Sequence, residues 1–255
     1  MLQERRNNIL EEVQENGSVK VADLSAKLQC SEVTIRNDIK HMDEQGLLKR
    51  THGGAMKMEE VAERKYTAES IYRHTKLKKQ IAACAYEYIN DRDTIIIDDA
   101  SSSFYLAEYI KRHTEKHLAI VTNSLLVGNE LAGIKQVELF MVGGTVGGNL
   151  AATMGDIAVE NLRQFHVDKA FIGVHGINFD VGLTSIATPQ MQVKKAILKA
   201  AQEVYVLADS SKFGGGYLSV ICPLHQVHKI ITDDQVKPEY IKRAEKEQVS
   251  LVISK

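Results

Sequence analysis

Apolar residues recur at helical spacing through the first part of the chain. Ile9, Leu10 and Val13 have the period of one helix face, which predicts a first helix. A second short helix is marked by the apolar positions Ala22, Leu24, Ala26 and Leu28. Together these segments predict two helices before residue 30.

A third helix is expected after Ser31, which is a favourable N-cap, and it ends near Gly46. Ile35, Ile39 and Met42 fall on one face of this helix. The segment LLKRTHGGAMK (47–57) then has two short extended arms around a Gly-Gly pair, which favours a hairpin turn. Three helices and a basic hairpin predict a winged helix-turn-helix over residues 1–57.

From residue 76 onward the pattern changes to short β-branched runs that alternate with helical stretches. The runs predicted to be strands are 94–98, 118–123, 137–142, 169–174, 204–209, 229–233 and 250–254. Nearly continuous apolar strands with helical crossovers predict an α/β fold whose parallel sheet is covered on both faces. Residues 76–255 are therefore expected to form a second domain, and the polar segment 58–75 a linker.

Composition narrows the class of protein. The 255 residues are 44% hydrophobic and 25% charged, with a formal net charge of -1, so any nucleic-acid binding must rest on a local basic patch. Cys30, Cys84 and Cys222 lie far apart, which fits neither a disulfide framework nor a zinc site. The sequence has no signal-peptide pattern and no apolar run near the ~20 residues of a membrane helix. A soluble cytoplasmic protein without metal or cofactor, and without a membrane partner, is expected.

The third helix and the hairpin carry the residues expected to bind DNA. In a helix-turn-helix the second helix of the motif enters the major groove. The candidates are Ser31, Thr34, Arg36, Asn37, Lys40, Arg50 and His52. Arginine suits guanine edges or phosphates, and asparagine suits adenine. A solvated charged face is the alternative, because basic and acidic residues are balanced in this region.

The stretch TIIIDDASSSF (94–104) predicts a strand, a hydroxyl-rich loop and the start of a helix. Serine hydroxyls and free N–H groups at a helix start favour an anion such as phosphate. Asp98, Ser101, Ser102 and Ser103 are the ligand-binding candidates here, with Asp98 accepting from sugar hydroxyls. Alternatively, Ser101 only caps the helix.

Ligands of parallel sheets bind beyond the carboxyl ends of the strands, so the later strand ends add candidates. These are Asn123, Ser124, Gly143, Gly144, His175, Asp209 and Lys212. Lys212 is the expected positive charge facing a phosphate, and Asp209 is expected to orient it. The two glycines can instead form a turn, and His175 can instead satisfy a local hydrogen bond.

Specific motifs resemble the DeoR family of bacterial sugar-operon regulators. They are R5-x3-I9-x3-V13, SEVTIRNDI (31–39) and GLLKRTHGGA (46–55), followed by IIIDDASSS, VTNSL, MVGG, DKAFIGVHGI, GLTS, LADSSKFG and IITD in the second domain. The resemblance implies a transcription regulator, usually a repressor, released by a phosphorylated sugar. It also implies a sensor fold related to ribose-5-phosphate isomerase and the CoA transferases.

The implied partners are double-stranded operator DNA and a sugar phosphate. A homodimer or homotetramer is expected, because one winged helix reads few bases and paired half-sites supply affinity.

The chain departs from the family pattern at two places. Ala100 stands where the family commonly has glycine, which predicts a tighter or shifted loop. Gln190 and Gln192 stand where the family tends to have acidic residues. The alternative function is a sugar-phosphate isomerase with an accessory DNA-binding domain. It is disfavoured because glutamine cannot abstract a proton as a catalytic carboxylate does.

Overall fold

The computed structural model divides the chain into two compact units, residues 1–61 and 62–255. It describes residues 5–6, 8–9, 12–13, 18–44, 48–51, 53–56, 69–148, 150–186 and 188–254. Residues 57–68, which hold most of the predicted linker, lie outside the described residues, as do Leu10, Gly46 and His52. The rest of the predicted linker contains α4 (Glu69–Tyr72) and the first residue of α5 (Thr75–Tyr86).

The first unit is a small winged helix-turn-helix built on one core. Helices α2 (Val21–Leu28) and α3 (Glu32–Glu44) follow the short strand β1 (Ser18–Lys20). Ile9, Val13, Leu24, Ile35, Ile39 and Met42 are buried together in the core. Of the other apolar positions predicted in the second helix, Leu28 is partly buried against this core, and Ala22 and Ala26 are exposed. The hairpin is formed by β2 (Lys49–Arg50) and β3 (Gly54–Met56).

Strand β1 was not predicted, and it completes the wing. The three strands have the order β1-β3-β2 and are antiparallel. Gly54 is required in β3, because a Cβ there would lie 1.8 Å from the carbonyl oxygen of Val19 in β1. The close approach of two strands, and not only a turn, therefore explains this glycine.

A buried carboxylate fixes the start of the chain to α3. Asp38 is 3% exposed, and its two oxygens accept from Arg5 Nε at 2.6 Å and Arg6 Nε at 3.0 Å. Burial acts to raise the pKa of Asp38, but the two guanidinium groups outweigh it and hold this pKa below its usual value. This double ion pair holds the orientation of α3.

The second unit contains a seven-stranded parallel sheet in the order β15-β14-β12-β9-β4-β5-β6. Its strands are β4 (Thr94–Ile97), β5 (Leu118–Thr122), β6 (Val137–Met141), β9 (Val167–Ile172), β12 (Ala201–Leu207), β14 (Lys229–Thr232) and β15 (Leu251–Ile253). All seven predicted strands are present, with ends that differ by a few residues. The prediction of an α/β domain with a parallel sheet is confirmed.

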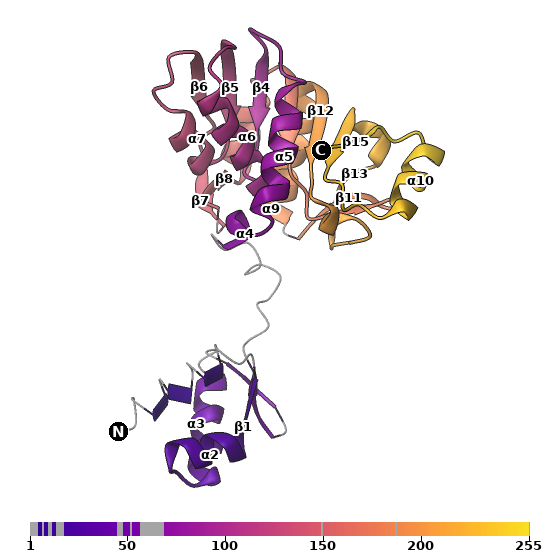
Figure 1. The fold of residues 1–255 in the computed structure, drawn as a ribbon. Helices are drawn as coiled ribbons and strands as arrows, with labels where there is room; N and C mark the ends of the chain where they lie inside the picture. The colour runs from indigo at the N-terminus through magenta and orange to yellow at the C-terminus, as the bar shows by residue number, and fades with distance from the viewer. Residues whose placement is uncertain are drawn as a thin grey trace. The chain divides into compact units, whose positions relative to one another are not determined.

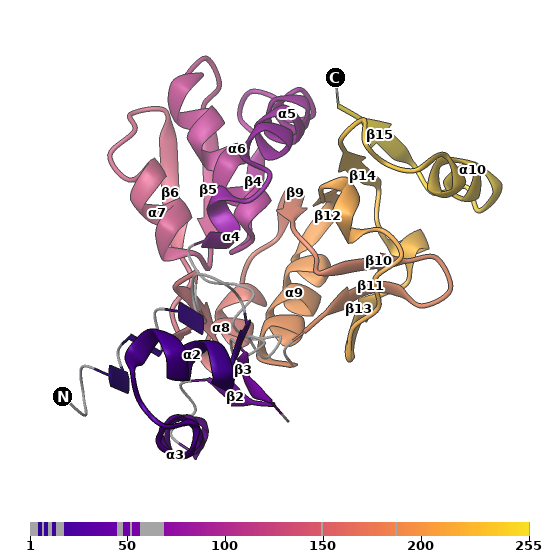
Figure 2. The same ribbon diagram turned by 60° about the horizontal axis from the view of Figure 1, so that its bottom comes forward.

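Helices cover both faces of this sheet (Figures 1 and 2). On one face α5, α6 (Ser101–Arg112) and α7 (Leu125–Leu131) pack with Ile95 and Ile97. On the other, α8 (Asp156–Leu162) and α9 (Thr188–Ala200) pack with Ile96. Alternate residues of β4 therefore enter different cores, as the pleat of a strand requires. Helix α10 (Pro238–Lys246) precedes the edge strand β15.

Short antiparallel strands that the sequence did not predict add to the parallel sheet. β7 (Thr145–Gly147) and β8 (Ala152–Met154) form a hairpin. β10 (Gly176–Asn178), β11 (Gly182–Ser185) and β13 (Ser219–Cys222) form a three-stranded sheet. Their few residues and glycine content give weak strand signals in the sequence.

Strand order reverses beside β4. The chain runs from β4 to β5 and β6 in one direction, and from β9 to β12, β14 and β15 in the other. Such a switch point between β4 and β9 leaves a crevice at the carboxyl ends of these strands, where ligands of open α/β sheets bind. Among the described residues no helix is long and apolar enough to span a membrane.

Candidate functional sites

A cavity of about 150 Å³ opens at this switch point. Its wall comes from the loop after β4, from the segment after β9, and from the turn after β12. Helices α5 and α9 and the residues before α5 complete it. The lining includes Arg73, His74, Lys78, Asp99, Ser101, Ser102, His175, Gln190, Lys194, Asp209, Lys212 and Tyr217. Eight of these twelve residues are Arg, Lys, His or Asp, whose side chains can carry charge, and such a lining suits a charged polar ligand.

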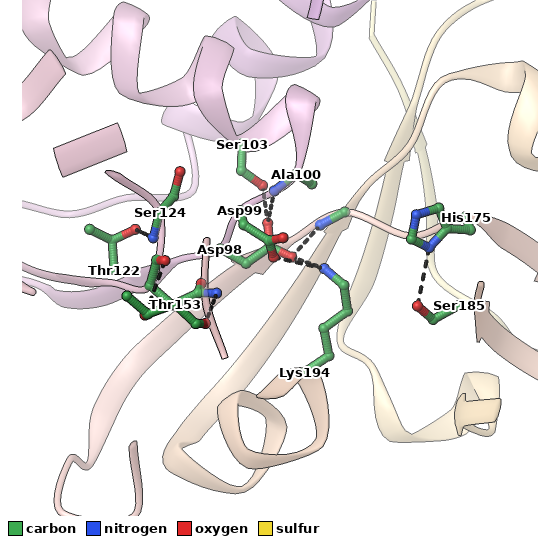
Figure 3. Close-up of polar contacts among 12 residues, drawn as sticks. Asp98, Asp99, Ala100, Ser103, Thr122, Ser124, Thr153, His175, Ser185 and Lys194 are labelled. Carbon is green, nitrogen blue, oxygen red and sulfur yellow. Dashed lines mark hydrogen bonds and ion pairs between the residues drawn. The ribbon is translucent and has the colours of Figure 1, made fainter. Parts of the chain in front are cut away.

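Asp98 is completely buried and accepts hydrogen bonds from the loop that follows β4, whose residues Asp99 to Ser102 line this cavity. Figure 3 shows these contacts of Asp98. One oxygen accepts from the Ala100 N–H at 3.0 Å and from the Ser103 hydroxyl, and the other accepts from the Gly173 N–H at 3.0 Å. Lys194 on α9 also donates to Asp98. These four donors occupy the carboxylate, so Asp98 holds β4, β9, α6 and α9 together and is not itself among the cavity-lining residues.

Lys194 was missed by the sequence reasoning, which considered only the glutamines of the same helix. Its ammonium is buried, bonded to Asp98 and 3.8 Å from Asp99 Oδ1. Burial acts to lower the pKa of Lys194, but the two carboxylates outweigh it and hold this pKa above its usual value. A charged Lys194 therefore lies in the cavity wall between α9 and the loop after β4.

Of the neighbours Asp98 and Asp99, Asp99 is the one that lines the cavity. Burial raises its pKa, the Asp98 charge adds to this, and Lys194 and the Asn123 side chain oppose it. The second residue of an Asp-Asp pair is hard to single out from sequence alone, because the direction of each side chain depends on how the chain leaves the strand.

The hydroxyl loop lies at the start of α6. Ala100, not Ser101, is the N-cap of this helix, and its methyl side chain makes no capping hydrogen bond. Ser101 and Ser102 line the cavity, whereas Ser103 is turned to Asp98. The alternative that Ser101 caps α6 is therefore wrong, and the first-turn N–H groups remain directed towards the cavity end of the helix.

Ala100 does not strain the loop. Its φ of -74° and ψ of 153° are those of an extended residue, so no positive φ is needed. Instead its methyl group faces Gly173, where a Cβ would lie 2.2 Å from the Ala100 Cβ. The glycine at position 173 leaves room for the Ala100 methyl group, so the loop holds an alanine with ordinary backbone angles.

Besides Lys194, two further lysines bring positive charge to the cavity from different elements. Lys78 lies on α5 and is buried, and burial lowers its pKa to about 8, with Asp209 opposing this shift. Lys212 lies in a 3-10 turn (Ser210–Lys212) whose N-cap is Asp209. Asp209 accepts from the Ser211 N–H at 3.1 Å and from the Ser211 hydroxyl, so it fixes the turn that presents Lys212.

His175 lies in the wall with its Nδ1 3.2 Å from the Ser185 hydroxyl (Figure 3). Burial lowers its pKa to about 3, and the charges of Lys194 and Lys212 act in the same direction. The imidazole is therefore neutral near pH 7, and it offers the cavity hydrogen bonding without charge.

Besides Asp98 and Ser103, four more predicted residues are not among those that line this cavity, and they are Asn123, Ser124, Gly143 and Gly144. The Asn123 amide donates to the Thr153 carbonyl at 3.3 Å, and Ser124 caps α7. The Gly143 N–H donates to Asn161, and a Cβ on Gly144 would lie 2.8 Å from the Met154 carbonyl. They follow β5 and β6, which lie beyond β4 from the switch point, and the β7–β8 hairpin covers those strand ends.

The candidate DNA-contacting residues lie on the first unit. The Ser31 hydroxyl accepts from the Thr34 N–H at 3.2 Å, which caps α3 as predicted. Arg36, Asn37 and Lys40 are exposed on the side of α3 away from Ile35 and Ile39. Arg36 donates to Glu32 at 2.8 Å within the same helix.

The wing contributes Arg50, whose side chain is exposed. The backbone N–H of Arg50 donates to the Asp43 carboxylate at 3.0 Å. The predicted contact His52 lies outside the described residues. The exposed side of α3 and the β2 arm therefore supply the candidate contacts of this unit.

A winged helix-turn-helix unit followed by an α/β unit with a polar cavity is the arrangement of a DNA-binding transcription regulator. Residues 5–61 match the DeoR-like helix-turn-helix domain, and residues 73–234 match the DeoR C-terminal sensor domain. The chain belongs to the DeoR family of transcription regulators.

Curated relatives cover nearly the whole chain. The transcriptional repressor AccR of Agrobacterium fabrum is 30% identical over 91% of this chain and 89% of its own length. The HTH-type transcriptional repressor CsqR of Escherichia coli K12 is 27% identical over 98% of this chain and 94% of its own. Both are named as repressors.

Solved structures with a related arrangement are more distant. A Pyrococcus horikoshii OT3 translation initiation factor eIF-2B structure has a TM-score of 0.47, 16% identity, and covers 89% of this chain and 94% of that chain. A D-ribose-5-phosphate isomerase in complex with phospho-erythronic acid has a TM-score of 0.40, 19% identity, and covers 55% and 54%.

Proposed function

We propose that this regulator represses a carbohydrate-utilisation operon and leaves its operator when a phosphorylated sugar binds in the switch-point cavity. The observation that carries the proposal is the charge arrangement of the wall. Ser101 and Ser102 line the cavity at the start of α6. Lys78 from α5, Lys212 from the turn after β12, and Asp99 line the same cavity. Cations and free N–H groups suit a phosphate, and a carboxylate suits sugar hydroxyls.

The sugar phosphate would lie with its phosphate towards the start of α6. Ser101 and Ser102 would donate hydroxyl hydrogen bonds, and Lys78 and Lys212 would supply charge. The sugar hydroxyls would meet Asp99, Gln190 and the neutral His175. The predicted contacts at Asp98 and Asp209 become supporting ones, since both carboxylates already accept from neighbouring backbone or hydroxyl groups.

Membership of a family of transcription regulators favours a sensor role over isomerase catalysis, and the engagement of Asp98 and Asp209 adds to this. Asp99 is the lining carboxylate that an isomerase would have to use as its base. A proton-abstracting base must have an oxygen free to reach the substrate. Asp98 accepts from four donors, and Asp209 is the cap of a 3-10 turn. Gln190, the side chain of the α9 start that lines the cavity, has no basic oxygen of the required strength.

Coupling to DNA would begin at the residues before α5. Arg73, His74 and Lys78 line the cavity and follow α4, which lies near the end of the predicted linker. A ligand that prefers one arrangement of this segment shifts the DNA affinity by its differential binding energy. A typical coupling of ~1–3 kcal/mol changes that affinity roughly 5–150-fold. Paired half-sites call for a homodimer or homotetramer on the operator.

Fluorescence anisotropy tests this function directly. The full chain is titrated, at fixed salt, onto the DNA upstream of its own gene and of the neighbouring operon, with and without a panel of sugar phosphates. Specific binding relieved by one compound supports the whole proposal. Specific binding that is indifferent to every compound contradicts the effector, and turnover of a sugar phosphate by the pure protein supports the isomerase alternative.

A further inference from the structure

The exposed side of α3 carries an apolar residue, Val33, directly opposite the buried side of the helix. Val33 is 65% exposed, while Ile35, Ile39 and Met42 on the opposite side are at most 1% exposed. At 3.6 residues per turn, Asn37 lies one turn and Lys40 two turns beyond Val33 on the same face. The middle of this surface is therefore a branched hydrocarbon group followed by an amide.

Arg36 lies to one side of this centre. Its guanidinium donates to Glu32, one turn earlier, at 2.8 Å, and both side chains are about half exposed. The ion pair leaves Val33 and Asn37 as the neighbouring side chains that project most directly from the helix. Valine also has a lower helix propensity than alanine or glutamate, so helix formation alone does not explain it at an exposed position.

The position of Val33 suits contact with base edges. It is the second residue of α3, and the N-terminal residues of a recognition helix approach the bases in the major groove. Among the groups displayed there, the thymine 5-methyl is the apolar one, while the others are hydrogen-bond donors or acceptors. A valine side chain cannot hydrogen-bond, so it discriminates by covering a methyl group and by excluding water from it.

We infer that Val33 is a specificity-determining residue that packs against a thymine methyl in each operator half-site. Asn37, one helical turn further on, pairs with a nearby adenine through its amide. This assignment uses the DNA-binding unit alone and does not depend on the nature of the effector.

Selection from a randomised duplex library tests the inference without a known operator. The full-length protein is used to select its preferred duplex, and each thymine is then replaced in turn by deoxyuridine, which removes the methyl group only. Wild type is expected to lose about three- to fivefold in affinity per half-site at one thymine position, the scale of one buried methyl group. Salt is held fixed throughout.

Val33→Ser should bind the thymine and deoxyuridine duplexes equally. The variant keeps its fold, since Val33 is exposed, and a thermal melt checks this. Val181→Ser, at an exposed valine of the second unit, is the matched control and should keep the wild-type ratio. Wild-type indifference to deoxyuridine at every position, or full discrimination by Val33→Ser, overturns the inference. The response of each variant to the sugar phosphate is measured as well. Because this response tests the proposed function and the deoxyuridine ratio tests the role of Val33, failure of one can be told from failure of the other.

Discussion

At the scale of single residues, the neighbours Asp98 and Asp99 have different roles because the chain turns between them. Asp98 is directed into the protein, where backbone, hydroxyl and ammonium donors surround it. Asp99 lines the cavity, and the Lys194 ammonium that donates to Asp98 also lies 3.8 Å from Asp99 Oδ1. A single position in the sequence thus separates a residue that builds the site from one that can meet a ligand.

Gly173 and Ala100 form a complementary pair that can be tested by a double-mutant cycle. Gly173→Ala would bring two Cβ atoms to 2.2 Å, so the loop must shift. We expect this variant to lose about 1–3 kcal/mol of unfolding free energy through overpacking. The double variant with Ala100→Gly should recover much of the loss, with a coupling of about 1–2 kcal/mol in urea denaturation. Additive effects of the two changes would contradict the direct contact.

The buried Lys78 ammonium is expected to cost stability at neutral pH. Its pKa is lowered from 10.5 to about 8, so the folded protein binds this proton more weakly than the unfolded chain does. Below pH 8 both states are protonated and the full cost is present. Between pH 8 and 10.5 the folded state releases the proton first, so the cost declines as pH rises.

Lys78→Met should therefore stabilise the protein at pH 7 by about 1–3 kcal/mol, given ~1.4 kcal/mol per pKa unit and partial screening. Urea denaturation at pH 7 and pH 10 measures this gain, which should shrink at the higher pH. Lys76→Met, at an exposed lysine of the same helix, corrects for general charge effects. A gain that is equal at both pH values would contradict a buried, easily deprotonated Lys78.

At the scale of elements, the joint between α4 and α5 depends on Tyr105 of α6. The Tyr105 hydroxyl donates to the Ile71 carbonyl at 3.0 Å and lies 3.0 Å from the Thr75 hydroxyl. Between them His74 has a positive φ of 54° and lines the cavity. Because α6 also begins at the serine loop, one helix contacts both the proposed phosphate site and the joint at the end of the predicted linker.

Tyr105→Phe should loosen this joint without removing any cavity-lining side chain. The Ile71 carbonyl would lose its buried donor, at a cost of about 1–2 kcal/mol. Hydrogen exchange followed by mass spectrometry should show faster exchange confined to residues 71–78. Tyr109→Phe, one turn further along α6, is the control, since its ring contact with His113 remains. Equal exchange in both variants would contradict a specific role for Tyr105.

At the scale of the whole molecule, the DNA-binding residues and the proposed ligand-binding cavity are expected in separate units of the chain. Each unit has its own core, and the described cavity is lined by residues of the second unit only. Substitutions in the cavity should therefore change the response to the effector and leave the affinity for DNA in its absence unchanged.

Lys212→Ala makes this separation measurable. Operator affinity without effector should stay within about twofold of wild type, while release by the active sugar phosphate should be lost, because a charge facing the phosphate is gone. Anisotropy titrations with and without the sugar phosphate measure both quantities. Lys199→Ala, at an exposed lysine outside the cavity, should respond normally. Normal release by Lys212→Ala would exclude this lysine from phosphate binding.

The sequence by itself determined the two units and most of their elements. Period-3.6 and β-branched runs are local signals, and they predicted the α2 and α3 helices, the wing hairpin and all seven parallel strands. Asp99, Lys78 and Lys194 were missed, although they line the cavity. They come from three elements, and no local pattern links residue 78 or residue 194 to the loop after β4.

Only the tertiary structure decided which strand ends share a site. Asp98, Asn123, Gly143 and Asp209 have equivalent positions at or just beyond the ends of strands, so the sequence gives them similar weight. The strand order puts β9 and β12 on one side of β4, and β5 and β6 on the other, where a hairpin covers their ends. Strand order arises from long-range packing of the whole sheet, and therefore the cavity was fixed by the fold and not by the motifs alone.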